Sequence, residues 1–252
     1  MKNILFLGTK PIGYKCLEIL IKNKERLGIN IRSVLTVEDK NFDSSLNIET
    51  LSKNNNLPVI SNLDDIIGLK DVDILISVQY HLILKQEHID VAKQIAINLH
   101  MAPLPEYRGC NQFSFAIIND DKVFGTTLHR LEAGIDSGDI IAEKRFAIPE
   151  NCYVSELYDL TFDNSLELFE AEIGNIVSAN YKLTPQKDYY QTRKHSIHYR
   201  KEITDIKKID VSWPAEKIFR YVRATSMPNF EPPYFTVGEE RVYLIPNKIY
   251  KK

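Results

Sequence analysis

Apolar runs alternate with mixed polar and apolar segments along residues 1–150. The run NILFLG at 3–8 is continuously apolar and ends in glycine, which is typical of a strand buried on both faces. The spacing of Ile12, Cys16 and Ile19 indicates a helix after it. Further strands are predicted at 31–37, 57–60, 72–78, 96–100, 123–131 and 139–148, with short helices at 45–55 and 62–69. This alternation predicts the α/β fold class: a Rossmann-like, mostly parallel sheet with helices on both faces.

The amino-acid composition changes in the second half of the chain. Residues 155–178 have apolar positions at helical spacing, with Ser155 as a plausible N-cap. After about residue 182, aliphatic residues become sparse; a short helix is predicted at 214–224 and a β-hairpin at 234–245. We therefore divide the chain into a main domain at 1–182 and a C-terminal extension at 183–252, too thin to bury a core of its own.

Two polar side chains stand at the end of a predicted buried strand. Asn98 and His100 are two residues apart, so on a strand they point to the same side. Ligands of parallel sheets lie beyond the carboxyl ends of the strands, which is where these two residues are expected. The loop PLPEYRG at 103–109 would stiffen such a site. A hydrogen-bonded pair that only secures the strand end is the alternative.

A second polar cluster, HRLEAGIDSGDII at 129–141, holds His129, Asp136 and Asp139. Asp-Ser-Gly-Asp is ordinary turn chemistry, and no familiar metal-ligand spacing accompanies His129. The loop leaves the strand that follows the one carrying Asn98, so a carboxylate here could orient His100 and stabilise its charged form.

Two other motifs are ambiguous or excluded. GTKPIG at 8–13 lacks the G-x-G-x-x-G spacing, so a tight turn is preferred and a dinucleotide cofactor is rejected. The Tyr- and Arg-rich stretches at 189–200 and 223–235 suit either a solvated face or interface, or stacking on a base and pairing with a diphosphate.

Charge and cysteine content narrow the class of partner. Lys and Arg total 32 against 34 Asp and Glu, a net charge of −2 that offers no global basic field for nucleic acid. The three cysteines are widely spaced and form no C-x-x-C motif, which favours a reducing compartment. The first apolar run is too short to span a bilayer and lacks a signal-peptide cleavage pattern. We expect a cytoplasmic protein with no metal, no nucleic-acid partner and no membrane association.

The two polar clusters together resemble the folate-dependent formyltransferase family. NLHMAPLPEYRG at 98–109 is similar to its N-x-H strand end and Tyr-Arg-Gly loop, and GTTLHRLEAGIDSGDII at 125–141 to its G-x-T-x-H and D-x-G-D-I motifs. The resemblance extends over roughly residues 1–175 and implies a formyltransferase catalytic domain with the catalytic trio Asn98, His100 and Asp136. The co-substrate it implies is 10-formyltetrahydrofolate, with no metal.

The resemblance also suggests binding residues. SVQYHLIL at 77–84 is similar to the family segment whose backbone holds the pterin ring. The folate-binding residues implied are Gln79, Tyr80, His81, Leu82, Ile83 and Asp139. The acceptor-binding residues we expect are Met101, Pro103, Tyr107, Arg108, Asn111, Arg223 and Phe230. Family members commonly have S-L-L-P after the histidine and a proline after Arg-Gly; this chain has Met101–Pro105 and Cys110–Gln112 there, which leaves the acceptor open.

Transfer to an amine fits these residue types. Asn98 and a suitably protonated His100 can donate to a tetrahedral oxyanion, and His100 or Asp136 can carry the proton. We expect Asp136 to orient His100.

The short tail with its hairpin is most similar to the sugar-nucleotide N-formyltransferases, which make N-formylated sugars for surface polysaccharides. The expected acceptor is therefore dTDP-4-amino-4,6-dideoxyglucose, and the hairpin is expected to form a homodimer interface. The alternatives are the dTDP-3-amino sugar, a methionyl-tRNA formyltransferase without its full C-terminal domain, and a binding module without turnover.

Overall fold

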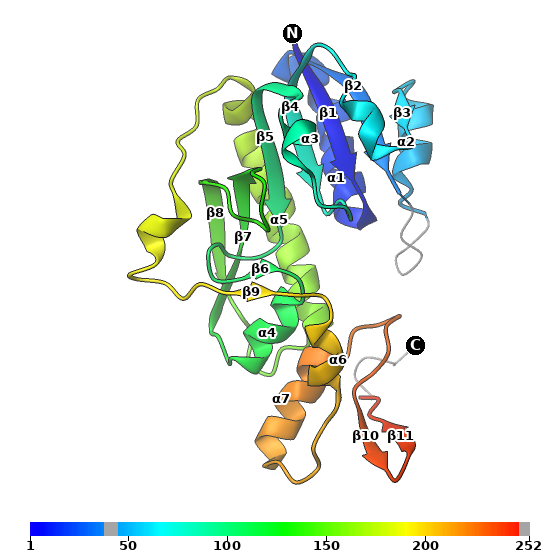
Figure 1. Ribbon diagram of the computed structural model, residues 1–252, viewed down its shortest axis with the longest axis vertical. Helices are drawn as coiled ribbons and strands as arrows, with labels where there is room; N and C mark the ends of the chain where they lie inside the picture. The colour runs from blue at the N-terminus through cyan, green and yellow to red at the C-terminus, as the bar shows by residue number, and fades with distance from the viewer. Residues whose placement is uncertain (38–44, 247–252) are drawn as a thin grey trace.

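A seven-stranded sheet in the order β3-β2-β1-β4-β5-β7-β8 forms the centre of the fold (Figure 1). The computed structural model describes residues 1–37 and 45–246. The strands are β1 (Lys2–Gly8), β2 (Ile29–Thr36), β3 (Val59–Ile60), β4 (Val72–Val78), β5 (Ala92–His100), β7 (Val123–Arg130) and β8 (Ile140–Ala147). The predicted α/β fold with a mostly parallel sheet is confirmed.

The sheet departs from parallel pairing at one edge. Strand β7 pairs antiparallel with β5, and β8 pairs antiparallel with β7. An antiparallel neighbour can be reached through a short loop, whereas a parallel one needs a crossover of a dozen or more residues. The segment 131–139 that joins β7 to β8 leaves the sheet beside Ala96 and Ile97 of β5. It then folds back, so that Asp136 lies near Asn98 and His100 at the carboxyl end of β5.

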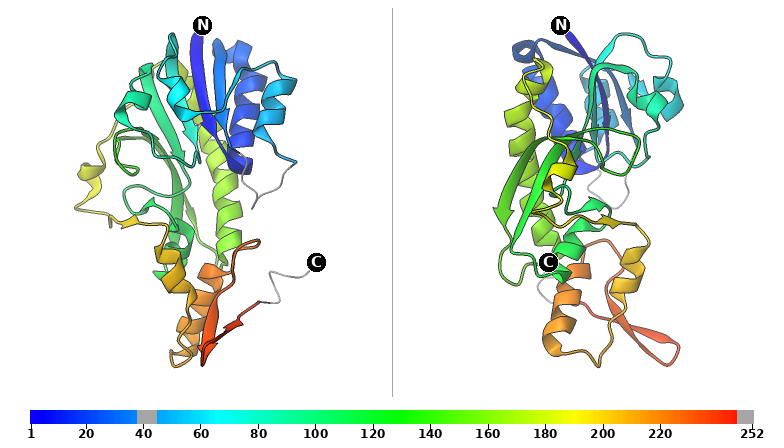
Figure 2. Two further views of the ribbon diagram at one scale, coloured as in Figure 1. Left: turned by 45° about the vertical axis from the view of Figure 1, so that its right-hand side comes forward. Right: turned by 60° about the vertical axis from the view of Figure 1, so that its left-hand side comes forward.

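Helices cover both faces of the sheet (Figure 2). On one face, α1 (Lys10–Leu27) and α5 (Val154–Val177) enclose an apolar core with the strands, in which Leu17, Ile76 and Phe169 are fully buried. The other face carries the short elements η1 (Leu63–Ile66) and α3 (Gln86–Ile89), packed on Leu5 and Leu75. Of the two predicted crossover helices, 45–55 contains α2 (Ile48–Asn54), and 62–69 holds only the single turn η1.

The N-cap of the long helix α5 lies two residues before the expected position. Its N-cap is Tyr153, which has an extended backbone and whose amide donates to Oε2 of Glu156 at 2.9 Å. The predicted N-cap at Ser155 is therefore wrong, because Ser155 already lies inside the first turn. A glutamate three residues into a helix satisfies an N-terminal amide that the helix itself leaves free.

The C-terminal region returns to the main domain before it forms its own elements (Figure 1). It contains η2 (Gln186–Tyr189), β9 (Ile197–His198), α6 (Glu202–Lys207), α7 (Ala215–Thr225) and the predicted antiparallel hairpin of β10 (Tyr234–Val237) and β11 (Glu240–Tyr243). Strand β9 pairs with β6 (Arg108–Gly109). Helix α7 packs on α4 (Gln112–Ile118), where Ala224 joins Ala116 and Ile117 in a buried cluster. In the described part of the chain, no helix has both the length and the apolar character needed to cross a membrane.

Candidate active site

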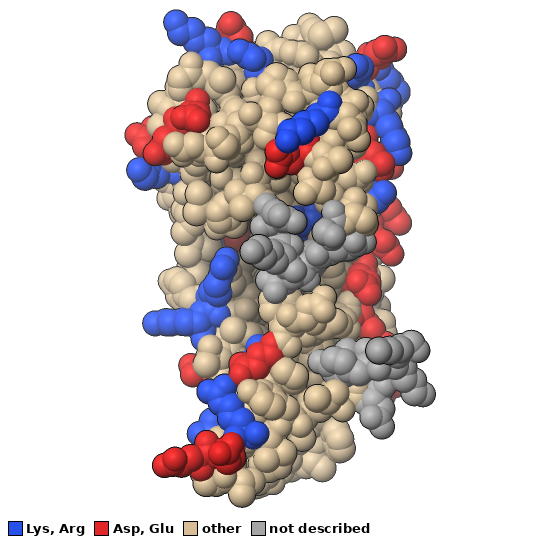
Figure 3. Space-filling view, turned by 90° about the vertical axis from the view of Figure 1, so that its right-hand side faces the viewer, with Lys and Arg blue, Asp and Glu red and all other residues tan. Residues whose placement is uncertain are grey.

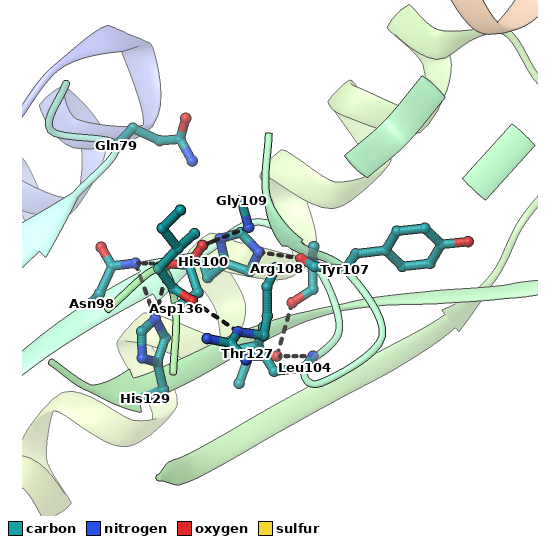
Figure 4. A network of polar contacts seen from close by, with 12 residues as sticks. Gln79, Asn98, His100, Leu104, Tyr107, Arg108, Gly109, Thr127, His129 and Asp136 are labelled. Atoms are coloured by element: carbon teal, nitrogen blue, oxygen red, sulfur yellow. Dashed lines mark hydrogen bonds and ion pairs between the residues drawn. The ribbon is translucent and has the colours of Figure 1, made fainter. Parts of the chain in front are cut away.

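Strand β5 ends in the two polar residues that the sequence singled out. The antiparallel register places Asn98 opposite His129 and His100 opposite Thr127 on β7. Nδ2 of Asn98 is 3.1 Å from Nε2 of His129, which is 1% exposed (Figure 4). Because Nδ1 of His129 lies 2.8 Å from the carbonyl of Arg130, that nitrogen carries a proton, and in the neutral ring Nε2 accepts from Asn98. Strand pairing thus anchors the Asn98 amide.

The loop between β7 and β8 brings Asp136 to the same place (Figure 4). Its Oδ2 accepts a hydrogen bond from the backbone amide of Gly109 at 2.9 Å and lies 3.6 Å from Nδ1 of His100. Its Oδ1 is 3.5 Å from both Nε2 of His129 and Nδ2 of Asn98. The structure therefore assembles an amide, two imidazoles and a carboxylate from β5, β7 and one loop.

His100 has one ring nitrogen engaged and the other available. Nε2 is 2.7 Å from the carbonyl of Tyr107, which can only accept, so Nε2 carries a hydrogen. Nδ1 then holds the lone pair of the neutral ring. Its 3.6 Å separation from Asp136 exceeds a hydrogen-bond distance, so a proton arriving at Nδ1 would find a carboxylate beside it. This geometry suits a general base that Asp136 stabilises once it is charged.

The surroundings of Asp136 keep it ionised. Burial by itself would raise the pKa of this carboxyl, but His100 and His129, when they are protonated, and the Gly109 amide outweigh burial and hold the pKa well below its usual range. Its backbone φ of +44° lies in the left-handed region, which aspartate tolerates better than most residues. The neighbouring groups therefore keep the carboxylate charged, and the left-handed loop conformation places it among them.

The loop after His100 is secured by Thr127. Its hydroxyl donates to the carbonyl of Ala102 at 2.8 Å and accepts from the amide of Leu104 at 3.2 Å. Nε of Arg108 donates to the carbonyl of Ile135 at 2.8 Å, which ties this loop to the one that carries Asp136. The two polar loops therefore hold each other in position.

The expected folate segment follows β4 at the same edge of the sheet. Gln79 has a φ of +53°, its carbonyl accepts from the Thr9 hydroxyl, and its side chain lies toward Asn98 and His100 in Figure 4. Tyr80 is partly buried, whereas His81, Leu82 and Ile83 are exposed, with Ile83 at 72%. Asp139 is engaged elsewhere, since its Oδ2 accepts from Arg130 at 2.9 Å.

Some of the residues expected to bind the acceptor lie near the polar cluster, and others lie in the C-terminal region. Met101 and Pro103 are buried, and Tyr107 is 3% exposed, with its hydroxyl donating to Asp121. Only the carbonyl of Tyr107 reaches His100. Asn111 is partly exposed, but its side chain donates to the carbonyl of Tyr199 at 2.9 Å. These side chains shape the site or hold the C-terminal region against it.

Two further expected residues lie in the C-terminal region. Arg223 lines a cavity of about 740 Å³ between the end of α4, residues 148–152 and α7, whose lining includes none of the trio. Phe230 is 41% exposed in the turn that follows α7. The structure does not bring either residue to Asn98, His100 and Asp136.

Two polar groups of this centre were missing from the sequence-based site. The sequence assigns no site role to His129, although it ends the G-x-T-x-H motif, and none to the Gly109 amide. The signal for His129 was its place on the next strand, but its role depends on the antiparallel register with β5. Among residues 1–37 and 45–246, no group of three His, Cys, Asp or Glu side chains is arranged to hold a metal ion.

The sequence is similar to those of a known protein family. Residues 3–171 match the formyl transferase family. The chain belongs to this family. The formyltransferase is 28% identical to a methionyl-tRNA formyltransferase of Clostridium tetani over 92% of this chain and 80% of the relative. It is 26% identical to a GDP-perosamine N-formyltransferase of Brucella melitensis over 70% of this chain and 65% of the relative.

One solved structure is similar to the formyltransferase over nearly its whole length. This structure, WlaRD, is described as a sugar 3N-formyl transferase in the presence of dTDP and 5-N-formyl-THF. It superposes with a TM-score of 0.79 and 26% identity, covering 96% of this chain and 85% of the other. The predicted family resemblance is therefore confirmed, and the similarity continues past residue 171, where the family match ends.

Proposed function

We propose that this formyltransferase moves a formyl group from 10-formyltetrahydrofolate to the amino group of a dTDP-linked amino-dideoxyhexose. The observation that carries this proposal is the available Nδ1 of His100, 3.6 Å from the charged Asp136, beside the Asn98 amide at the carboxyl end of β5. Similarity to the WlaRD structure, which contains dTDP and a formylated folate, supports both substrates. The site residues and the cytoplasmic role in surface-polysaccharide synthesis remain part of this proposal.

In the proposed reaction, a neutral amine attacks the formyl carbon and forms a tetrahedral oxyanion. Asn98 is the donor for this oxyanion, because its 3.5 Å contact with Asp136 lies at the limit of a hydrogen bond and is easily exchanged for a stronger one. Nδ1 of His100 takes the proton from the attacking nitrogen, and Asp136 stabilises the resulting imidazolium. His100 then passes the proton to the folate nitrogen as the bond between that nitrogen and the formyl carbon breaks.

The two substrates approach from different sides in this proposal. The pterin ring lies against the backbone of residues 79–83, which follow the carboxyl end of β4 and in which His81, Leu82 and Ile83 are exposed. The sugar lies near Arg108, whose guanidinium uses Nε to hold Ile135. Its two terminal nitrogens have no hydrogen-bond partner in the parts of the chain that the structure describes, so they suit an acceptor phosphate.

The position of the amine distinguishes two acceptors. The resemblance of the tail favours dTDP-4-amino-4,6-dideoxyglucose, whereas WlaRD, at 26% identity, is a 3N-formyl transferase. The acceptor loop at 101–112 departs from the common family pattern, so neither isomer follows from the motif. Both isomers belong in the same assay.

Charged initiator tRNA is the second candidate acceptor, since the Clostridium tetani relative is a methionyl-tRNA formyltransferase. The net charge of −2 does not favour it. On the face drawn in Figure 3, Lys and Arg lie in separate small groups interspersed with Asp and Glu. A nucleic-acid surface would be expected to gather its positive charge on one face.

One experiment tests the proposal directly. The protein is incubated with 10-formyltetrahydrofolate and, in parallel, with dTDP-4-amino and dTDP-3-amino sugars, their UDP counterparts and charged initiator tRNA. Mass spectrometry should detect a gain of one formyl group on a dTDP-amino sugar. Formylation of the tRNA alone would replace the proposal with the second candidate. Binding of both substrates without any product would indicate a module without turnover.

A further inference from the structure

Gln186 joins the C-terminal region to the loop that carries Asp136. Its side chain is 4% exposed, and its Nε2 donates to the carbonyls of Asp136 and Gly138 at 2.7 and 2.8 Å. One amide nitrogen has two hydrogens, so it can satisfy both carbonyls at once. Gln186 lies outside the family match at 3–171 and outside the predicted main domain.

Neighbouring contacts place this side chain firmly. Thr184 and Ile140 exchange two backbone hydrogen bonds of 2.8 and 2.9 Å, which fasten the segment before Gln186 to the start of β8. Within the loop, a Cβ on Gly138 would lie 1.9 Å from the carbonyl of Arg130, so the loop passes too close to β7 to shift in that direction. The side-chain amide of Gln186 therefore contacts the β7–β8 loop at a fixed position.

The bond to Asp136 bears on the site because this residue has a φ of +44°. A left-handed aspartate costs free energy unless its surroundings favour that conformation. Gln186 binds its carbonyl, and the Gly109 amide binds its carboxylate at 2.9 Å. Backbone and side chain of Asp136 are thus held from two separate segments, which sets the carboxylate opposite Nδ1 of His100.

We infer that Gln186 is a positioning residue for Asp136, and that the C-terminal segment which carries it is a working part of the active site. This inference rests on the proposed formyl transfer for its effect on turnover, but the positioning itself concerns only the protein. Gln186 touches neither substrate nor reacting atoms in this account. It acts by holding the loop in which Asp136 faces His100.

The test uses Gln186→Met in the 252-residue chain. Methionine keeps the length and nearly the volume of the side chain but has no donor. The matched control is Gln94→Met, because Gln94, which is partly buried, likewise donates from Nε2 to a backbone carbonyl, that of Ile176, at 2.8 Å. This contact lies at the C-terminal end of α5, outside the polar cluster. Thermal unfolding of both variants measures the loss of stability that they share.

Amide hydrogen exchange reports the position of Asp136 without any turnover. The amides of three consecutive residues have different acceptors: Arg108 donates to Ser196, Gly109 to the Asp136 carboxylate and Cys110 to His198. In Gln186→Met, Gly109 should lose protection by about tenfold or more while its two neighbours keep theirs. In Gln94→Met, all three should remain protected.

Turnover provides the second measurement. A displacement of about 1 Å in a catalytic group can cost on the order of 10²-fold, so kcat of Gln186→Met should fall by about 10- to 100-fold, with both KM values within about twofold. Unchanged Gly109 protection together with a kcat equal to that of the control would overturn the inference. Loss of protection at all three amides would also overturn it, since Gln186 would then only dock the segment. If the wild type formylates no acceptor, the proposed function fails, and the exchange comparison still decides the positioning role.

Discussion

Nδ1 of His100 and Oδ2 of Asp136 lie 3.6 Å apart, although one residue ends β5 and the other lies in the loop between β7 and β8. The antiparallel pairing of β7 with β5 makes this meeting possible, because it starts the loop beside Ala96 and Ile97 of β5, and the loop folds back to the strand end where His100 lies. The relationship explains why an apolar strand can end in a polar pair: the pair has partners, and those partners are titratable.

Asp136→Asn should remove the charge that stabilises a protonated His100 while keeping the shape of the side chain. We expect kcat to fall by about 10²–10⁴-fold, the range of general acid–base catalysis, with smaller changes in KM. Formyl transfer to the dTDP-amino sugar, followed by mass spectrometry, measures this effect. Asp120→Asn, at an exposed position after α4, serves as the control. Near-normal turnover of Asp136→Asn would remove Asp136 from the mechanism.

Asn98→Ala should remove the proposed oxyanion donor. The loss of one such donor raises the barrier by about 2.7–4 kcal/mol in other enzymes, so we expect kcat to fall by about 10²–10³-fold. Single-turnover kinetics with saturating substrates separate this chemical step from binding. Asn175→Ala on α5 is the matched control, since its side-chain amide donates to Glu172 at 3.0 Å, away from the polar cluster. A change confined to KM would instead assign Asn98 to substrate binding.

The stability that Asp136 contributes should depend on pH with a definite sign. Its native pKa lies below the ordinary value of about 3.9, because the histidines and the Gly109 amide outweigh burial. A lowered native pKa contributes stability above the unfolded-state value and loses it as the pH falls toward the native one. Urea unfolding should therefore show wild type more stable than Asp136→Asn near pH 6, with the difference narrowing below about pH 4. If the unfolding free energies of wild type and Asp136→Asn changed in parallel with pH, the charged state assigned to Asp136 would be contradicted.

Tyr107→Phe should separate structure from binding at a residue that the sequence assigned to the acceptor. The hydroxyl donates to Asp121 and accepts from Asn119 at 3.1 Å, and the ring is buried. We expect the free energy of unfolding to fall by about 1–3 kcal/mol, because the variant loses a hydrogen bond from a buried ring to a carboxylate, while KM for the acceptor stays unchanged. A raised acceptor KM at unaltered stability would return Tyr107 to the binding site.

The proposed homodimer through the C-terminal hairpin has its own test. Val242 on β11 is 41% exposed. Other apolar residues of this small sheet are also exposed, including Val237 at 61%. If the hairpin is the interface, Val242→Glu should convert a dimer into a monomer in analytical ultracentrifugation. Val123→Glu, at a 51% exposed position on β7, provides a control of the same chemistry outside the hairpin. An unchanged dimer in Val242→Glu would place the interface elsewhere.

By itself, the sequence determined the class of fold and the residues with the most distinctive chemistry. Continuous apolar runs predict buried strands because strands covered on both faces have no polar side, and that pattern located β1 and β4 closely and β5 at its carboxyl end. Asn98 and His100 stood out because polar groups at the end of an apolar strand depart from their local pattern, whereas the trio with Asp136 is what the resemblance to the formyltransferase family implies. These are local properties, which depend on a few neighbouring residues.

Only the tertiary structure decided which polar groups meet. The antiparallel register placed His129 beside Asn98, the left-handed Asp136 turned its carboxylate to Gly109, and Gln186 arrived from a segment far along the chain. Burial likewise placed Tyr107 in the apolar core, where its hydroxyl reaches Asp121. The physical reason is that register and long-range hydrogen bonds depend on how separate elements pack, and no short stretch of sequence contains that information.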